Sequence, residues 1–181
     1  RLEIGIGAGW AEEECRAYVI DLGTLTERFD RFDEACAIIH GMLTNTQTDF
    51  SGRYFTLEEA RCNPPPVQQP HPPICIGGNG ERRTFPNVVK WADHWNYPGF
   101  DLEGFVAKRD VLHGMCEQAG RDPEEIMTSV HQLFDVDDLD AAEANAAKFK
   151  EAGLDLMLFY LPPPHSATVL EPLARIAERV G

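Results

Sequence analysis

Strand-like and helix-like patterns alternate along almost the whole of this chain of 181 residues. Each short apolar run is followed by a segment in which apolar residues recur at helical spacing. Strands joined by helices pair in parallel, because the chain must cross back over the sheet between them. The alternation therefore predicts an α/β fold in which helices cover a parallel sheet. The predicted strands lie at 2–7, 74–77, 93–97, 127–136 and 154–161.

The predicted helices have recognisable ends. Thr24 or Thr26 precedes Glu27 as a candidate N-cap, and Gly120 stands where a C-cap glycine is expected. Pro86 fits a helix only if it lies in the first turn, where its missing N–H does no harm. The helices are expected at 24–43, 81–92, 102–120, 139–153 and 165–181.

One stretch, at about 44–72, breaks the alternation. Aromatic residues flank Ser51 and Gly52, which predicts a small hairpin, and the proline-rich end that runs to Pro73 forbids a helix. An interdomain linker is the alternative, but the alternation resumes unchanged after the stretch. We therefore expect a single α/β domain over 1–181 with an inserted excursion.

The five strand–helix units are compatible with either an open doubly wound sheet or a (β/α)8 barrel. A complete barrel typically takes about 250 residues, so a barrel would need three further units upstream. The sequence opens within a strand pattern, "RLEIGIGAGW", without a methionine, and we expect the start of the polypeptide to be missing. The apolar run "LMLFYL", at 156–161, predicts a strand buried on both faces.

The net charge of −14, from 30 acidic and 16 basic side chains, argues against nucleic-acid binding because it repels phosphate backbones. No apolar run approaches the roughly 20 residues that span a bilayer, and no signal peptide is visible. We therefore expect a cytoplasmic protein without a membrane partner. Scattered cysteines favour reduced thiols over disulfides or a zinc site, so no metal is expected. They are Cys15, Cys36, Cys62, Cys75 and Cys116.

Two predicted strands run into glycine-rich segments, Gly5–Gly9 and Gly77–Gly80. Ligands of parallel α/β folds lie beyond the carboxyl ends of the strands, where we expect the two segments to approach each other. Glycine backbone before a helix that begins near Glu81 suits a phosphate. Arg82 or Arg83 would add a charge-assisted hydrogen bond. An ordinary tight turn is the alternative, and neither a P-loop nor a dinucleotide fingerprint fits.

Aromatic side chains supply the remaining candidates. Trp10 and Trp95, at strand ends, are candidates to wall a planar ligand. His94 and His131 lie in strand patterns, where a role facing the inside of a barrel competes with an ordinary strand position.

Four blocks of the sequence resemble consecutive core blocks of the luciferase-like monooxygenases. They are "LEIGIGAGWAEEECRAY", "ERFDRFDEACAIIHGML", "DFSGRYFTLEEARCNPPPVQQPHPPICIGGNGERR" and "VVKWADHWN". That family comprises flavin- and deazaflavin-dependent (β/α)8 TIM barrels, and the set is most similar to the branch that uses coenzyme F-420. The resemblance implies an incomplete barrel: about the last five strand–helix units are present, and strands one to three are not.

In that family the two glycine segments end the fourth and fifth barrel strands. The resemblance implies that Ala8, Gly9 and Trp10 lie near the cofactor ring or its ribityl chain. Ala11 departs from the asparagine frequent after the family's tryptophan, which weakens a side-chain role there. The resemblance assigns the phosphate end of the cofactor to Gly77, Gly78, Asn79, Gly80, Glu81 and Arg82.

The function implied is an oxidoreductase that transfers hydride between coenzyme F-420 and an organic small-molecule substrate. An FMN-dependent monooxygenase that uses O2 is the alternative. A truncated, non-catalytic barrel that binds a ligand or assembles with a partner is the second alternative. Because a partial barrel exposes strand edges, we expect homodimer formation. The absent strands would carry much of the pocket, so no catalytic residue is named.

Overall fold

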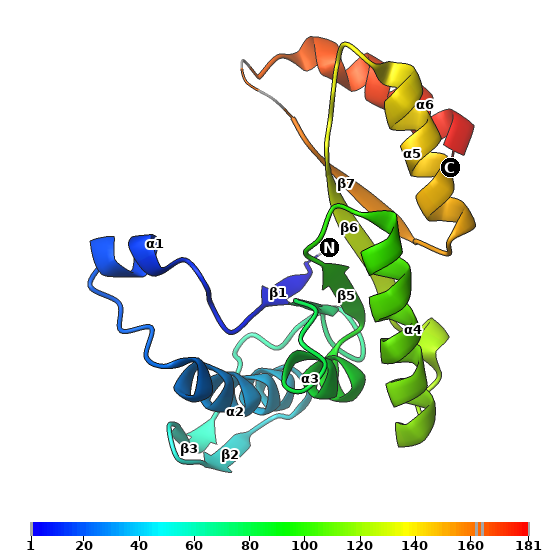
Figure 1. The fold of residues 1–181 in the computed structure, drawn as a ribbon. Coiled ribbons are helices and arrows are strands. Elements are labelled where there is room, and N and C mark those ends of the chain that lie inside the picture. The colour runs from blue at the N-terminus through cyan, green and yellow to red at the C-terminus, as the bar shows by residue number, and fades with distance from the viewer. Residues whose placement is uncertain (1, 162, 164, 181) are drawn as a thin grey trace. The chain divides into compact units, whose positions relative to one another are not determined.

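The structure is a computed structural model that describes residues 2–161, 163 and 165–180 (Figure 1). The chain forms two compact units, residues 1–94 and 95–181. Five strands form one sheet in the order β1-β4-β5-β6-β7, and β5 (His94–Tyr97) lies at the boundary of the units. The single domain expected from the sequence stays a prediction. No helix among the described residues has the length and hydropathy needed to cross a membrane.

The first unit is built on two parallel strands. β1 (Ile4–Ile6) pairs with β4 (Ile74–Gly77), and Gly5 lies opposite Cys75. Some 70 residues separate these strands in sequence, and the crossover between them carries helices, as the alternation predicted. The parallel pairing confirms the fold class in this part of the chain.

One helix packs on β4 in the first unit, and a second helix packs on the first. α2 (Leu25–Thr44) contacts α3 (Thr84–Trp91), and α3 contacts β4. Ile74 and Ile76 are fully buried, whereas Cys75 between them is only half-buried. Successive side chains of a strand point to opposite faces. The isoleucines therefore lie on the buried face of β4, and Cys75 lies on the opposite face.

The start of α2 carries a complete capping box. The Thr24 hydroxyl accepts a hydrogen bond from the N–H of Glu27, and the Glu27 carboxylate accepts one from the N–H of Thr24. This reciprocal pair satisfies two backbone donors that would otherwise lack partners. The N-cap is therefore Thr24, and the alternative at Thr26 is wrong.

The excursion contains the predicted hairpin, β2 (Thr48–Ser51) paired antiparallel with β3 (Thr56–Ala60). One carboxylate of α2 holds its tip. Glu34 accepts hydrogen bonds of 2.7–3.0 Å from the backbone N–H groups of residues 53–55. The tip is thereby fixed to α2 through main-chain donors.

Between β1 and α2 the chain leaves the body of the unit as an arm that carries α1 (Glu12–Ala17), a helix that the sequence did not predict (Figure 1). No residue of α1 is buried. Two arginines of α2 hold the two ends of the arm by its backbone. The Nη1 of Arg28 donates to the carbonyl of Gly9 at 3.0 Å, and the Nη2 of Arg31 donates to that of Leu22 at 2.8 Å.

In the second unit, β6 (Met127–Leu133) pairs in parallel with β7 (Leu156–Tyr160). Gly120 ends its first helix with a φ of 73°, the left-handed C-cap that the sequence indicated. Gly181, the expected end of the last helix, lies outside the described residues. The helical elements are α4 (Leu102–Ala119), η1 (Pro123–Glu125), α5 (Leu139–Glu151), η2 (Ala167–Val169) and α6 (Leu170–Val180).

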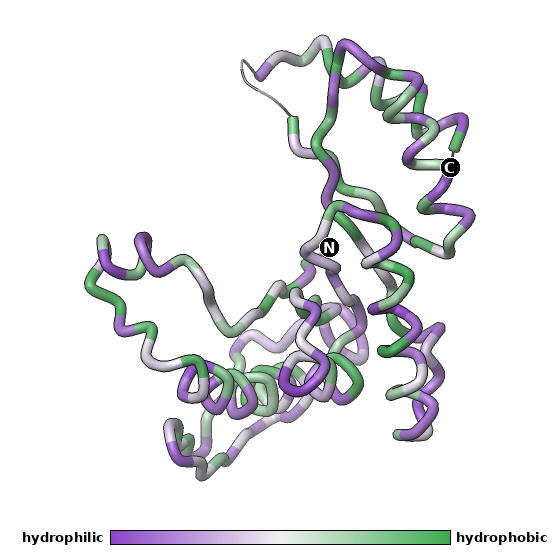
Figure 2. The backbone as a smooth tube through the Cα atoms, in the orientation of Figure 1, coloured by the Kyte–Doolittle hydropathy of each residue, from purple (hydrophilic) through white to green (hydrophobic). Residues whose placement is uncertain are grey.

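Aromatic rings form the core of the second unit. Trp95 is fully buried and stacks on Phe105 with ring centroids 6.1 Å apart, and Phe105 contacts Phe149 in turn. The expectation that Trp95 walls a ligand is therefore wrong, because its ring is enclosed by core side chains. Hydrophobic and hydrophilic bands alternate along α2 and α4, as expected of helices with one buried face (Figure 2).

The strand β7 is buried on one face only. Met157 and Phe159 pack on a hydrophobic cluster formed by Phe134, Ala146 and Ile176. Tyr160, in contrast, is 50% exposed. β7 is the last strand in the sheet order. The prediction of burial on both faces is wrong for the described residues, because the helices of this unit cover the face of Met157 and Phe159.

Candidate functional site

The two glycine-rich segments follow neighbouring parallel strands of the first unit. Ile6 lies opposite Ile76 in the register of β1 and β4, so Gly7 and Gly77 come next at the same edge. The expected approach of the segments at one end of the sheet is confirmed. The carboxyl ends of parallel strands are where α/β folds bind ligands.

The backbone at this edge is open to a ligand. A Cβ atom added at Gly7 or Gly77 would meet no other heavy atom within 4 Å. Two further glycines are needed for conformation, because the φ of Gly9 is 85° and that of Gly78 is 126°. Open space and backbone shape therefore both account for glycine in these segments.

The helix after the second segment begins at Thr84, not near Glu81 as expected. The N–H groups of Thr84 and Phe85 both donate to the carbonyl of Gly80, at 2.8 and 3.0 Å. The first helical donors therefore close the turn instead of pointing to a ligand. Glu81 and Arg82 lie in the exposed turn that precedes α3, and Pro86 lies in the first helical turn as expected.

Arg83 is not available for a phosphate in the way that the sequence suggested. Its Nη2 donates to Asp30 at 2.8 Å and to Asp33 at 2.7 Å, both on α2. The hydrogen bond to Asp30, with the further contacts to Asp33, raises the pKa of the guanidinium. Asn87 donates to Asp33 as well, at 2.6 Å. Arg83 thus ties α3 to α2, which leaves Arg82 as the exposed cation of the turn.

Ala8 lines a hollow of about 230 Å³ between the end of β1 and α2. Arg28 and Arg31 line the same hollow, beside Phe32 and Phe55. The Nε of Arg28 is buried without a hydrogen-bond partner among the described residues. Together with the bond from Arg28 to Gly9, these contacts fix the turn that follows β1.

The other candidate side chains are dispersed. Trp10 is 85% exposed on the arm, directly after the first glycine segment. In the second unit, His131 stacks on Tyr160 with ring centroids 4.8 Å apart. His94 is buried and bonds to Glu3, whose role the sequence did not suggest.

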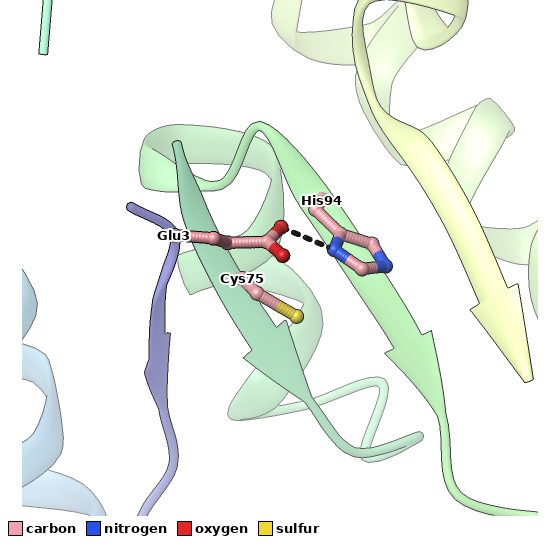
Figure 3. A group of neighbouring side chains, drawn as sticks. All are labelled: Glu3, Cys75 and His94. Carbon is pink, nitrogen blue, oxygen red and sulfur yellow. Dashed lines mark hydrogen bonds and ion pairs between the residues drawn. The ribbon is translucent and has the colours of Figure 1, made fainter. Parts of the chain in front are cut away.

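Glu3 and His94 meet Cys75 on one face of the first unit's strands (Figure 3). The Nδ1 of His94 lies 2.6 Å from the Oε1 of Glu3. Burial, with the nearby Glu3 carboxylate, raises the pKa of the Cys75 thiol to about 12. The group lies toward the amino-terminal ends of the strands, whereas Gly7 and Gly77 lie at their carboxyl ends.

Three charged side chains that the sequence analysis missed shape the surroundings of the site. They are Arg28, Arg31 and Glu34, which lie three residues apart along α2. Residues at this spacing share a helix face. The spacing was the one available signal, because their partners are backbone atoms far along the chain.

A family model described as luciferase-like monooxygenase matches residues 1–179. The chain belongs to this family. This luciferase-like chain is 28% identical over 147 residues to an F-420-dependent hydroxymycolic acid dehydrogenase of Mycobacterium tuberculosis. The aligned region covers 81% of this chain and 39% of that protein. The chain is 26% identical over 121 residues to an FMNH(2)-dependent dimethylsulfone monooxygenase of Pseudomonas putida. This aligned region covers 66% of this chain and 33% of that protein. The matches thus span little more than a third of the length of these relatives.

Solved structures share the fold of this luciferase-like chain at low sequence identity. A coenzyme F-420-dependent tetrahydromethanopterin reductase from Methanopyrus kandleri matches with a TM-score of 0.79 and 12% identity, covering 98% of this chain and 74% of that one. An F-420-dependent secondary alcohol dehydrogenase matches with a TM-score of 0.81 and 16% identity, covering 100% of this chain and 70% of that one. The likeness confirms the fold class, an α/β fold of the luciferase-like TIM-barrel family.

Proposed function

We propose that this chain belongs to an oxidoreductase that transfers hydride between coenzyme F-420 and an organic small molecule. The observation that carries the proposal is the pair of glycine segments at one edge of β1 and β4, in a chain of the luciferase-like family. The relative that covers more of this chain is named as F-420-dependent, and so are both structural neighbours described above. These relatives favour the deazaflavin over the flavin.

The edge of the sheet fits a cofactor of this shape in two respects. The space beyond Gly7 and Gly77 is open, so the backbone can approach a ligand closely. Arg82 is exposed in the turn beyond Gly77, where a cation can pair with an anionic group. With a net charge of −14 over the chain, such a local cation matters for an anionic cofactor.

The roles of the individual residues follow from their places at this edge. In this proposal the exposed turn binds the phosphate end, and the ring or its ribityl chain lies near Ala8, Gly9 and Trp10. The bound cofactor supplies the hydride chemistry, and the protein supplies orientation and electrostatics. The phosphate end is assigned to Gly77, Gly78, Asn79, Gly80, Glu81 and Arg82.

The alternative function is an FMN-dependent monooxygenase that uses O2. The relative from Pseudomonas putida is named as FMNH(2)-dependent, which supports this alternative. A non-catalytic partial barrel is the second alternative. In each case we propose a cytoplasmic protein that binds a small molecule and forms a homodimer, since the strands β1 and β7 end the sheet order. Light scattering tests the dimer, and a monodisperse monomer would contradict it.

Cofactor retention tests the proposed function. The protein encoded by the complete natural gene is incubated with F-420 or with FMN and passed through a desalting column. We expect F-420 to be retained and FMN to be lost, as measured by the absorbance of the protein fraction. Retention of FMN alone would favour the monooxygenase, and retention of neither would reject both enzymes.

Matched glycine variants locate the binding site. Gly77→Ala fills the open space beyond β4 and should weaken F-420 binding at least about tenfold if the backbone contacts the ligand closely. Gly114→Ala, on α4, fills space that is equally open and should leave binding unchanged. Equal affinity in both variants would place the cofactor elsewhere.

A further inference from the structure

Three side chains with metal-binding atoms converge on one face of the first unit. Glu3 directly precedes β1, Cys75 lies within β4, and His94 begins β5 (Figure 3). The sheet order makes these three strands consecutive neighbours. One carboxylate oxygen, the sulfur and one imidazole nitrogen all lie within 4.8 Å of one another.

Strand geometry explains why these residues meet. Ile74 and Ile76 occupy the buried face of β4, so Cys75 points to the other face. The residue opposite Cys75 in the register is Gly5, and a Cβ added there would meet nothing within 4 Å. The missing side chain leaves open space beside the thiol, which is where a water or another fourth ligand of a metal can lie.

We propose that Glu3, Cys75 and His94 form a three-ligand site for a divalent transition metal, with Zn²⁺ as the preferred ion. Thiolate, imidazole and carboxylate are the protein ligands of zinc, and three of them with one open position make a complete tetrahedral set. The sulfur and nitrogen donors disfavour Mg²⁺ and Ca²⁺, which prefer oxygen ligands.

The positions of the ligand atoms need only a small adjustment. Zinc bonds of about 2.0–2.3 Å in a tetrahedron separate ligand atoms by roughly 3.3–3.8 Å. The contact of 2.6 Å between Glu3 and His94 must therefore lengthen, because it has the length of a hydrogen bond. The Glu3 side chain is 41% exposed and lies outside β1, so it can move, whereas that of His94 is 4% exposed and stays fixed.

Charge balance favours the occupied site. Binding of Zn²⁺ displaces the proton shared by Glu3 and His94 and the proton of the Cys75 thiol. One carboxylate, one thiolate and a neutral imidazole then surround a charge of +2, so the complex carries no net charge. A neutral complex avoids the cost of leaving an unpaired charge beside a buried strand. The ion would join the beginnings of three strands, whereas the proposed cofactor edge lies at the carboxyl ends of β1 and β4.

Cobalt titration tests this site directly. The full chain is freed of metal with a chelator and titrated with Co²⁺, whose absorption bands report thiolate coordination and tetrahedral geometry. We expect a thiolate-to-cobalt band at one equivalent, and we expect Zn²⁺ but not Mg²⁺ to abolish it. Absence of the band in a chain that is folded by circular dichroism would overturn the proposal.

Two variants and one control make the assignment specific. Cys75→Ser should lose the thiolate band, and Cys62→Ser should keep it, because Cys62 lies in the excursion. Glu3→Gln should weaken cobalt binding at least about tenfold, since even the loss of a group that only hydrogen-bonds to a metal ligand costs about 10–100-fold in metal affinity. A band that persists in Cys75→Ser would overturn the proposal, as would unchanged affinity in a folded Glu3→Gln variant.

Discussion

The guanidinium of Arg83 donates to the carboxylate of Asp33 at 2.7 Å and so joins the first residues of α3 to the middle of α2. The two residues are 50 positions apart in sequence. Arg83 directly follows the turn to which we assign the cofactor phosphate. Its contacts thereby fix the end of that turn relative to a long helix.

Arg83→Ala should destabilise the protein by about 1 kcal/mol. Hydrogen bonds between charged groups contribute about 1.5–3 kcal/mol when buried, and the side chain of Arg83 is 36% exposed, which reduces the value. Urea unfolding measures the change. Arg82→Ala is the control and should shift the unfolding free energy by less than about 0.5 kcal/mol. Equal losses in both variants would contradict the assigned roles.

Gly78→Ala should destabilise the protein where Gly77→Ala does not. A φ of 126° at Gly78 excludes a strain-free alanine, and the added Cβ would lie 3.1 Å from the Cγ2 of Thr84. The expected cost is about 1–3 kcal/mol. Gly77→Ala should stay within about 0.5 kcal/mol of the parent. Thermal unfolding compares the two, and a stable Gly78→Ala variant would show that the loop adopts another conformation.

Glu34→Gln should lower stability at neutral pH and have no effect in acid. Partial desolvation raises the pKa of Glu34, but hydrogen bonds from the N–H groups of Tyr54, Arg53 and Phe55 outweigh it and lower the net pKa. A lowered folded-state pKa stabilises the protein above the ordinary value of 4.5, and this contribution disappears as the pH falls through the folded-state pKa.

The urea midpoints of Glu34→Gln and its parent, measured from pH 7 downward, check this linkage. The difference should be largest at pH 7 and shrink below pH 4.5. Glu58→Gln, an exposed position on β3, is the control and should show no such trend. A difference that is constant with pH would mean that packing, not ionisation, explains the effect.

Trp95→Ala should destabilise the second unit strongly, whereas Trp10→Ala should not affect stability. Removing a fully buried tryptophan from a stack on Phe105 costs about 3–5 kcal/mol. Trp10 is 85% exposed, so the expected change is within about 0.5 kcal/mol. If Trp10 contacts the cofactor ring as proposed, its variant should lose F-420 affinity while remaining stable.

Local patterns in the sequence predicted most elements of the fold, although not α1. The capping box at Thr24 and the glycine C-cap at Gly120 are short-range signals, and both are present. The parallel direction of β1 and β4 follows from the crossover between them. Each of these features depends on a few neighbouring residues or on chain connectivity, which a single sequence contains.

Features that depend on distant partners were not predictable in this way. The start of α3 is moved to Thr84 by a turn that closes on Gly80, and Arg83 is drawn to acidic residues 50 and 53 positions away. The proposed metal site likewise needs the arrangement of three strands before Glu3 and His94 can be seen as neighbours. An apolar run such as β7 does not reveal which face a helix will cover.

Arg28 and Arg31 hold the arm through hydrogen bonds to the carbonyl oxygens of Gly9 and Leu22, and not to side chains. Every amino acid offers the same carbonyl, so these hydrogen bonds do not depend on a side chain of the arm. Mutations can therefore change the exposed side chains between residues 10 and 20 while the ends of the arm stay anchored. Such a segment, beside a proposed cofactor edge, is where related proteins can diverge in ligand preference without redesigning the scaffold.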